Sequence, residues 1–430
     1  MTASTGDDST FASTGPSVAI VGAGPAGLIA AQVLAEAGCR VSLYERMASP
    51  ARKFLIAGRG GLNLTHSEPR ESFLARYGAA RDWLAPMLDV YPPARLRALA
   101  ERLGEATFIG TSGRVFPKSF KASPLLRTWL GRLGELGVTL ETRHDWRGWT
   151  PEGALRFSTP QGEHVVAADA AIFALGGASW PRLGGDGSWV APFREAGVSV
   201  APLRPSNSGA RIVWSDFFRA RHAGQPLKRI ALTAGGVRAR GEAMITEAGL
   251  EGGAVYELSA RLREEAEWDG AARLTVDLRP DLGEAELVAR LAATRKGESM
   301  ANRLRKAAAL SPAAASLLRE AGLDLPSEPK ALAMRIKAVP LAVEGLAGLE
   351  RAISSAGGVA RSALGPDLML TARSGQFIAG EMLDWEAPTG GYLLQGCFAT
   401  GYAAACGALR HLGLAEPTPW TGPWHAGDAD

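Results

Sequence analysis

The sequence predicts an α/β protein whose main domain is a split Rossmann-type fold, and three observations support this class. Residues 18–45 read as an apolar strand, a glycine-rich turn, a helix and a second strand that ends in an acid. A second buried strand-like run, residues 170–175, leads into two glycines, and a third, residues 377–381, ends in glycine and acid. Apolar strands that alternate with helices are typical of doubly wound parallel sheets. Because these segments stand near both ends of the 430 residues, we expect other pieces to be inserted between them.

Composition and charge suit a folded protein of two or three domains. Hydrophobic residues make up 46% and charged residues 21%, and the net charge of +3 does not by itself argue for nucleic acid. The three cysteines form no CxxC pair and the six histidines no i, i+4 pair, so we expect no disulfide framework, no dithiol centre and no metal site. Residues 1–17 look like a disordered tail rather than a signal peptide, and no segment nears the roughly 20 apolar residues of a membrane span, so we expect a cytoplasmic protein.

The first glycine turn carries the strongest binding signal. Gly22, Gly24 and Gly27 have G-x-G-x-x-G spacing, in which the glycines allow a tight turn, a close approach of a pyrophosphate and close packing of helix on strand. The helix that follows directs its positive dipole end at the phosphates, and Glu45 can accept hydrogen bonds from ribose hydroxyls. We therefore predict an adenine dinucleotide site made of Gly22, Gly24, Pro25, Ala26, Gly27, Glu45 and Arg46.

A second cofactor-side stretch lies near the C-terminus. Glu381 follows an apolar strand and Gly380, and such an acid can bind the ribityl chain of a flavin. A helix expected from about residue 399 would direct its N-terminal N–H groups at the flavin O2, where negative charge grows on reduction. An NAD fold has no role for this stretch, so we favour FAD over NAD; an ordinary strand–loop–helix is the alternative. The residues assigned to it are Gly380, Glu381, Asp384, Gly390, Gly391 and Tyr392, with Gly176 and Gly177 on a second loop.

Residues 52–66 hold three closely spaced glycines, Gly58, Gly60 and Gly61, a high entropic cost unless the backbone must pass close to a ligand. The isoalloxazine ring is our candidate, contacted by Gly60, Gly61 and Asn63. Arg59 and Asn63 are candidates for bonds to flavin or substrate oxygens and His66 for donating a proton. A solvated loop histidine is an equal alternative for His66, and a phosphate or surface contact for Arg59.

Two basic stretches remain open in meaning. Residues 113–124 mix cations with aromatics ahead of a helix, and Lys118 is a candidate for an anionic substrate or an NAD(P)H phosphate, although a solvated loop is slightly favoured. In a helical insert, a cluster could contact RNA, but charged helix faces are usually only solvated. That cluster is Arg295, Lys296, Arg303, Arg305 and Lys306.

The remaining elements follow from periodicity and turn residues. Helices are expected over residues 81–88, 93–103, 125–136 (with Ser123 as N-cap and Pro124 in the first turn) and 399–412, and strands over 138–142, 155–159 and 164–168. Residues 197–282 read as mostly β, with strands such as 230–233, 254–258 and 273–278. The expected division is a tail at 1–17, a cofactor domain of 18–198 and 357–415, a β-rich insert of 199–282 and 334–356, a helical subdomain of 283–333 and a tail at 416–430.

Taken in order, these stretches resemble the BaiN/YhiN-like family of FAD-dependent oxidoreductases, the aminoacetone-oxidase-like flavoproteins, in a proteobacterial branch. The motifs are VAIVGAGPAGLIAA, ARKFLIAGRGGLNLTHSE, GRVFPKSFKASP, FALGGASWPRLGGDG and AGEMLDWEAPTGGYLLQGCFATGYAA. The resemblance implies a split, GR2-like FAD domain with an inserted β-barrel-like domain that carries a small helical domain. It also implies that Arg52 and Lys53 join the residues that bind FAD non-covalently.

One departure from the family pattern affects the chemistry. The family usually reads Gly-Arg-Cys-Asn, whereas this chain has Leu62 in place of the cysteine and its arginine at Arg59. A mechanism that needs that thiol cannot operate here.

From the residues and the resemblance together we expect NAD(P)H-driven hydride transfer through flavin N5 to an activated C=C bond, since relatives are linked to steroid-like enones and to uridine in ribosomal RNA. The groups that we expect to act on the substrate, as the candidate catalytic residues, are Arg59, Asn63, His66 and Lys118. An amine oxidase that uses O₂ and an RNA-associated flavoprotein are the two alternatives. The partner that we expect is a small molecule, with RNA less favoured.

Overall fold

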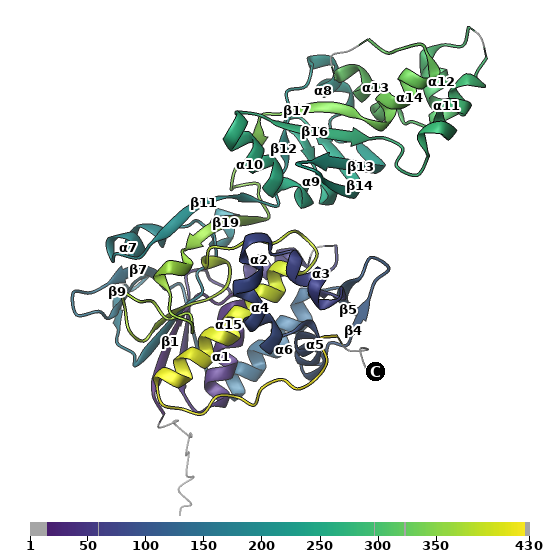
Figure 1. Cartoon of the computed structure of the whole chain (residues 1–430). Helices are drawn as coiled ribbons and strands as arrows, with labels where there is room; N and C mark the ends of the chain where they lie inside the picture. Colours follow the sequence, from purple (N-terminus) through teal and green to yellow (C-terminus); the bar gives the residue numbers. More distant parts are fainter. Residues whose placement is uncertain (1–14, 59, 296, 322–323, 426–430) are drawn as a thin grey trace, which may run out of the picture. The chain divides into compact units, whose positions relative to one another are not determined.

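The computed structural model describes residues 15–58, 60–295, 297–321 and 324–425 (Figure 1). The chain divides into two compact units, Met1–Leu203 with Ala356–Asp430, and Arg204–Ser355. The first unit therefore contains both the purple N-terminal and the yellow C-terminal segments of Figure 1. The sequence places the corresponding boundaries at 198/199 and 356/357, within five residues of these divisions.

A five-stranded parallel sheet forms the centre of the first unit, in the order β20-β10-β1-β2-β6. Ile20, Leu43 and Phe173 in the three middle strands have no exposed surface, because both faces of the sheet are covered. This confirms the α/β class and the parallel Rossmann-like sheet. The strands are β1 Ser17–Val21, β2 Arg40–Glu45, β6 Thr139–Thr142, β10 Ala170–Phe173 and β20 Gln376–Ile378.

Two long helices from opposite ends of the chain, α1 (Pro25–Glu36) and α15 (Tyr392–His411), pack side by side against the sheet (Figure 1). A Cβ at Gly401 would lie 2.4 Å from the carbonyl oxygen of Ala26, so the glycine permits this close approach. The other helices of this unit are α2 Arg52–Ala57, α3 Arg70–Ala75, α4 Arg81–Val90, α5 Pro93–Arg102, α6 Ala122–Glu135 and α7 Val190–Glu195.

Three smaller sheets complete the first unit and its connections. One has the order β3-β5-β4, a second β7-β8-β9, and the third pairs the connecting strands β11 and β19. Their bounds are β3 Thr65–His66, β4 Thr107–Ile109, β5 Arg114–Pro117, β7 Asp145–Trp149, β8 Leu155–Thr159, β9 Gly162–Val166, β11 Val200–Ser206 and β19 Ser354–Val359.

The second unit is built on a seven-stranded antiparallel sheet in the order β17-β16-β13-β14-β15-β12-β18, with its own apolar core. The strands are β12 Ala210–Arg211, β13 Pro226–Ala234, β14 Val237–Thr246, β15 Gly249–Glu251, β16 Ala272–Asp277, β17 Val339–Val343 and β18 Gly345–Leu346. The helices are α8 Asp216–His222, α9 Gly253–Glu257, α10 Ser259–Asp269, α11 Glu284–Ala292, α12 Met300–Ala308, α13 Pro312–Glu320 and α14 Pro329–Lys337.

Several local predictions are wrong. Residues 254–257 lie in α9 and Leu258 is its C-cap, so this segment is not a strand. Five residues are too few for their periodicity to distinguish a helix from a strand. Helix α6 begins at Ala122 with Lys121 as N-cap, so Ser123 is not the cap. Helix α15 begins at Tyr392, seven residues before the expected start at residue 399.

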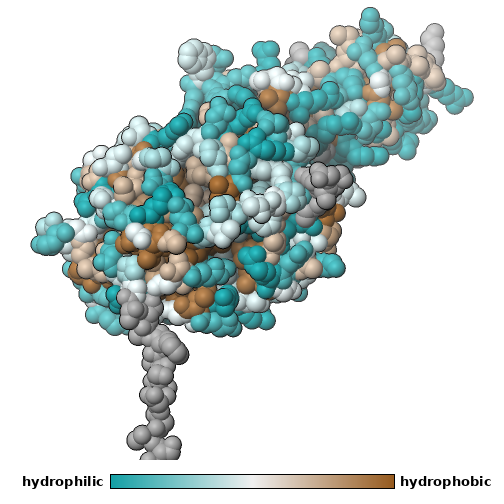
Figure 2. All heavy atoms as spheres, turned by 60° about the horizontal axis from the view of Figure 1, so that its bottom comes forward, coloured by the Kyte–Doolittle hydropathy of each residue, from teal (hydrophilic) through white to brown (hydrophobic). Residues whose placement is uncertain are grey.

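The described part of the chain contains no helix that is long and apolar enough to cross a membrane. Figure 2 shows one face of the molecule, on which hydrophobic and hydrophilic side chains are interleaved.

Candidate functional site

The turn between β1 and α1 has room for a ligand at one glycine only. Gly22 has a φ of +109°, and a Cβ there would lie 2.3 Å from the carbonyl oxygen of Ala174 on the neighbouring strand. A Cβ at Gly27 would lie 2.0 Å from the carbonyl oxygen of Gly22. At Gly24, by contrast, no described atom lies within 4 Å of the added Cβ. Gly22 and Gly27 are thus required by the fold, and Gly24 borders open space.

That open space lies at the N-terminus of α1. Gly24 is the N-cap and offers no side-chain acceptor, and Pro25 occupies the first helical turn. The free N–H groups of the first turn and the helix dipole therefore favour an anion at this place. The geometry fits a pyrophosphate.

Glu45 closes the same edge of the sheet at the end of β2. Its Oε2 accepts a hydrogen bond from the Ala23 N–H at 3.3 Å, and its Oε1 accepts one from the Met47 N–H at 2.8 Å. Burial raises the pKa of Glu45, opposed by these two hydrogen bonds and by the charges of Arg46 and Arg52. A carboxylate can accept about four hydrogen bonds, so Glu45 retains acceptor capacity for ribose hydroxyls.

Arg46 forms ion pairs with two aspartates. Its guanidinium lies 2.7 Å from Asp186 and 3.5 Å from Asp145, and it donates to the carbonyl oxygen of Gly184 at 3.3 Å. Hydrogen bonding to Asp186 and the two nearby carboxylates raise the pKa of Arg46 although burial opposes this. These contacts join the end of β2 to the loops that carry Gly184 and Asp186.

Lys53 and Glu381 form an ion pair that joins α2 to the segment after β20. The Lys53 Nζ lies 2.7 Å from Glu381 Oε2 and donates to Ser179 Oγ at 2.8 Å. Glu381 is buried, and its Oε2 also accepts from the Gly177 N–H at 3.4 Å. The assigned residues Gly177, Lys53 and Glu381 are therefore brought together. Asp384 is exposed, and its backbone N–H donates to the carbonyl oxygen of Val359 at 3.0 Å.

The N-terminus of α15 meets the glycine loop of residues 60–66. Gly390 and Gly391 have φ values of +134° and +92°, and a Cβ at Gly391 would lie 2.6 Å from the Cα of Thr65. Because α15 starts at Tyr392, its free N–H groups lie at these glycines and not at Thr400. Thr400 instead accepts the Gly380 N–H at 3.0 Å through its hydroxyl.

Two polar atoms of the glycine loop are buried without a partner. Asn63 Oδ1 and Thr65 Oγ1 have no hydrogen-bond partner among the described residues. Buried polar atoms are normally bonded, and an exception calls for an explanation such as an absent ligand or water. Both atoms lie in the loop assigned to the isoalloxazine ring. They fit a planar ligand with polar edges, and Arg59 of the same loop lies outside the described residues.

The structure shows the surroundings of His66 and Lys118. Both ring nitrogens of His66 are bonded: Nδ1 accepts from the Glu68 N–H at 3.2 Å, and Nε2 donates to the carbonyl oxygen of Ser112 at 3.0 Å. Burial lowers the pKa of His66, so the neutral ring is favoured. Lys118 is exposed, and its backbone N–H bonds to the carbonyl oxygen of Ala106 at 2.8 Å.

A polar cluster that sequence reasoning missed lies around Tyr392. The Tyr392 hydroxyl donates to Glu68 Oε2 at 2.8 Å, the Arg76 guanidinium bonds to the same carboxylate, and the His66 ring stacks on Tyr392 at 5.3 Å between centroids. Burial opposes ionisation of Glu68, but the bonds from Arg76 and Tyr392 lower its pKa overall. Burial and the bond to Glu68 raise the pKa of Tyr392. In the sequence, Tyr392 after Gly390 and Gly391 is the one feature that points to this cluster.

Thiol chemistry has no reactive group here. Leu62, at the position of the family cysteine, is fully buried. Burial raises the pKa of Cys397 to about 12 and that of Cys406 to about 11, so both are protonated at neutral pH. Cys39 is buried as well, and its pKa is also raised.

Two members of the basic cluster of the insert, Arg303 and Lys306, bond to residues of their own unit. Arg303 donates to Thr294 Oγ1 at 3.1 Å and to the carbonyl oxygen of Ser327 at 2.9 Å, and Lys306 pairs with Glu298. Lys296 lies outside the described residues.

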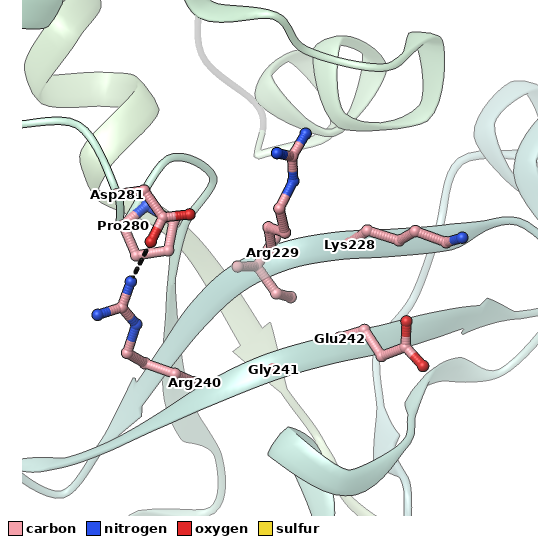
Figure 3. A pocket seen from close by; sticks show the side chains of 8 residues that line it. Lys228, Arg229, Arg240, Gly241, Glu242, Pro280 and Asp281 are labelled. Atoms are coloured by element: carbon pink, nitrogen blue, oxygen red, sulfur yellow. Dashed lines mark hydrogen bonds and ion pairs between the residues drawn. The ribbon is translucent and has the colours of Figure 1, made fainter. Parts of the chain in front are cut away.

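A surface groove of about 490 Å³ lies in the second unit (Figure 3). It is lined by the cations Lys228, Arg229 and Arg240 and by the acids Glu242 and Asp281, with Arg240 bonded to Asp281. Its charges have both signs and it lies within the antiparallel sheet of the insert, so it is not part of the dinucleotide turn.

Comparison with known proteins identifies the family. Residues 16–407 match the family described as HI0933-like protein Rossmann domain. The chain belongs to this family. It is 26% identical to a 3-dehydro-bile acid delta(4,6)-reductase of Clostridium scindens, over 91% of this chain and 99% of that protein.

Among solved structures, the chain resembles a 3-ketosteroid delta1-dehydrogenase from Sterolibacterium denitrificans, with 14% identity, a TM-score of 0.50 and coverage of 92% of this chain and 98% of that one. This likeness shows the shared fold. With its family and reductase relative, the chain is an FAD-dependent oxidoreductase with a Rossmann fold.

Proposed function

We propose that this oxidoreductase accepts hydride from NADH or NADPH and passes it through flavin N5 to one carbon of the activated C=C bond of an apolar enone, while a proton from water adds to the other carbon. The observation that carries the proposal is the match to a bile acid reductase along nearly the whole of both chains. Only one G-x-G-x-x-G turn is present, so the nicotinamide nucleotide would bind transiently rather than in a second Rossmann domain. We propose a small molecule as the substrate rather than RNA, because Arg303 is bonded within its own unit.

The residues of the first unit divide the work of holding FAD. The N-terminus of α1 would hold the pyrophosphate beside Gly24, and Glu45 would accept hydrogen bonds from the ribose hydroxyls. The Lys53–Glu381 pair fixes the loop of Gly177 against the segment after β20. When bound, FAD supplies the hydride chemistry, and the protein supplies binding, orientation and electrostatics.

Groups of this chain also stabilise the charge that reduction creates. The first N–H groups of α15 follow Gly391 and present a positive dipole end, which favours negative charge on the pyrimidine side of the ring. Asn63 Oδ1 and Thr65 Oγ1, which have no hydrogen-bond partner among the described residues, would be available for hydrogen bonds to a bound ring. His66 acts as a positioning residue: its neutral ring supports Tyr392 by stacking, and its one N–H proton is bonded to the carbonyl oxygen of Ser112.

The test is a single-turnover experiment under anaerobic conditions. FAD-loaded protein is reduced with NADPH or NADH and then mixed with testosterone, which contains an activated C=C bond. The proposal predicts flavin reoxidation with one saturated ketone formed per flavin. If testosterone leaves the flavin reduced, while an amine reduces it and O₂ reoxidises it, the protein is an amine oxidase. The Gly24→Asp variant, which should not load FAD, controls for reaction without the cofactor.

A further inference from the structure

Three phenylalanines form a cluster on the β4–β5 hairpin. The rings of Phe108, Phe116 and Phe120, which we call the phenylalanine cluster, have centroids 5.8, 5.1 and 5.7 Å apart. Phe120 is 48% exposed, and the other two are partly exposed. An aromatic group of this kind is usually buried in a core, so its exposure calls for an explanation.

The cluster is continuous with the loop assigned to the flavin ring. A Cβ at Gly61 would lie 3.2 Å from Phe120 Cδ1 and 3.5 Å from Phe116 Cε1, and the Leu62 N–H donates to the carbonyl oxygen of Phe120 at 2.8 Å. In the same loop, Asn63 Oδ1 is buried without a partner among the described residues. The phenylalanine cluster therefore borders the residues that would contact the isoalloxazine ring.

Strand register extends this aromatic surface toward α15. Phe108 pairs with Phe116 across β4 and β5, and His66 pairs with Arg114 across β3 and β5. Since positions 114 and 116 share one face of β5, His66 lies on the same face as the phenylalanines. His66 stacks on Tyr392 at the start of α15, so aromatic rings follow this face from α15 to the hairpin.

Phe120 is held in an unfavourable backbone conformation. Its φ is +59°, in the left-handed region that bulky residues avoid. A hydrogen bond from its own N–H to the carbonyl oxygen of Pro117 at 2.9 Å, together with the bond from Leu62, fixes it there. Strain of this kind persists where the surroundings impose it and is concentrated at ligand sites. Here it keeps an apolar ring exposed beside the cofactor loop.

We propose that the phenylalanine cluster binds the body of a flat, apolar, multi-ring enone and so selects such substrates over small ones. This inference rests on the reductase function proposed above. Offset stacking and edge contacts with aromatic rings favour flat apolar molecules. A second copy of the chain would fit this surface less well. A stable protein interface buries about 800 Å² on each partner, whereas Ile109 and Phe120 are the large hydrophobic residues that are about half exposed in this part of the described structure, and two side chains offer much less area than that.

The experiment measures testosterone binding by equilibrium dialysis against the FAD-loaded protein, a readout that does not depend on turnover. Phe120→Asn removes the ring and suits the left-handed backbone, so the fold should be kept. Phe108→Ala removes a second ring. We expect each to raise the testosterone Kd about tenfold, the scale of losing one ring contact. FAD content should be unchanged, and the reduction of the single-ring cyclohexenone should fall by much less than the affinity for testosterone.

The matched control is Phe217→Ala, which removes a phenylalanine that is 66% exposed on α8 of the other unit and should leave the testosterone Kd unchanged. An unchanged testosterone Kd in both cluster variants would overturn the inference, as would equal losses for testosterone and cyclohexenone. A change in oligomeric state without a change in Kd would also overturn it. If neither enone is reduced by the wild type but testosterone binding still falls in the variants, the reductase function fails and the binding surface stands.

Discussion

A methyl group added at Gly27 should lower the stability of the fold, whereas one added at Gly24 should weaken FAD binding and leave the stability nearly unchanged. A Cβ at Gly27 would lie 2.0 Å from a backbone oxygen, well inside the 3.0 Å below which an atom must shift. Overpacking costs about 1–3 kcal/mol, and since the obstacle is backbone we expect Gly27→Ala to lower the free energy of unfolding by about 3 kcal/mol. Gly24 has an extended backbone, with φ −85° and ψ −179°, and no described atom within 4 Å.

For Gly24→Ala, two small effects on stability oppose each other. The lower entropy of the unfolded chain favours alanine by about 0.4–1 kcal/mol, and the poorer N-cap disfavours it by a similar amount. The free energy of unfolding should therefore stay within about 0.5 kcal/mol of the wild type. The methyl group would, however, occupy the space where the pyrophosphate approaches, so the FAD Kd should rise at least about tenfold, a loss of about 1.4 kcal/mol.

The assay combines urea unfolding of the FAD-free protein with FAD titration of each variant. Gly131→Ala is the control, because Gly131 lies in helix α6 with no described atom within 4 Å of the added Cβ and is remote in sequence from the turn. It should be stabilised by up to about 1 kcal/mol with no change in FAD affinity. The reasoning is refuted if Gly24→Ala destabilises the protein as much as Gly27→Ala, or if it binds FAD as tightly as the wild type.

Three further predictions concern charged groups of the first unit. Burial raises the pKa of Glu45 above its usual 4.5, so the folded state binds this proton more tightly than the unfolded state. The stability of the FAD-free protein should therefore fall as pH rises through and above 4.5. In Glu45→Gln this decline should vanish, and the affinity for FAD should drop. Burial lowers the pKa of His66, so stability should fall as pH drops below about 6.5, and thermal melts of His66→Gln should show a smaller loss. The Lys53 side chain is 29% exposed and that of Glu381 is 7% exposed, so their ion pair is partly shielded from water. A double-mutant cycle with Lys53→Met and Glu381→Gln, measured by urea unfolding, should give a coupling free energy of about 2 kcal/mol. A coupling near zero would exclude a structural role for the pair.

The sequence could predict the parts of the site that are local in the chain. The first βαβ unit combines an apolar strand, three spaced glycines and a terminal acid within 28 residues, and the structure places these glycines and Glu45 at one edge of the sheet. Each of these signals depends only on neighbours in sequence. The Rossmann sheet and the dinucleotide site followed from them, whereas FAD rather than NAD was inferred from the stretch around Glu381 and from the family resemblance.

The rest depends on contacts between distant segments. Lys53 meets Glu381 across 328 positions and Glu68 meets Tyr392 across 324, and no local pattern indicates either pair. The sequence prediction starts α15 about seven residues too late, because it assigns Gly390 and Gly391 to a flavin-binding loop. In the structure both glycines have positive φ values, and Gly391 is the N-cap from which the helix begins at Tyr392. The exposure of Phe120 could not be predicted, because composition does not show which aromatic residues of a loop are buried.

The most direct measurement is the absorbance spectrum of the purified protein under anaerobic conditions, recorded before and after the addition of NADH and then NADPH. The account predicts the spectrum of an oxidised flavin that bleaches with at least one of the two nucleotides. A protein without flavin, even after incubation with FAD, would contradict the central claim. A flavin that neither nucleotide bleaches would contradict NAD(P)H as the donor and leave FAD binding intact.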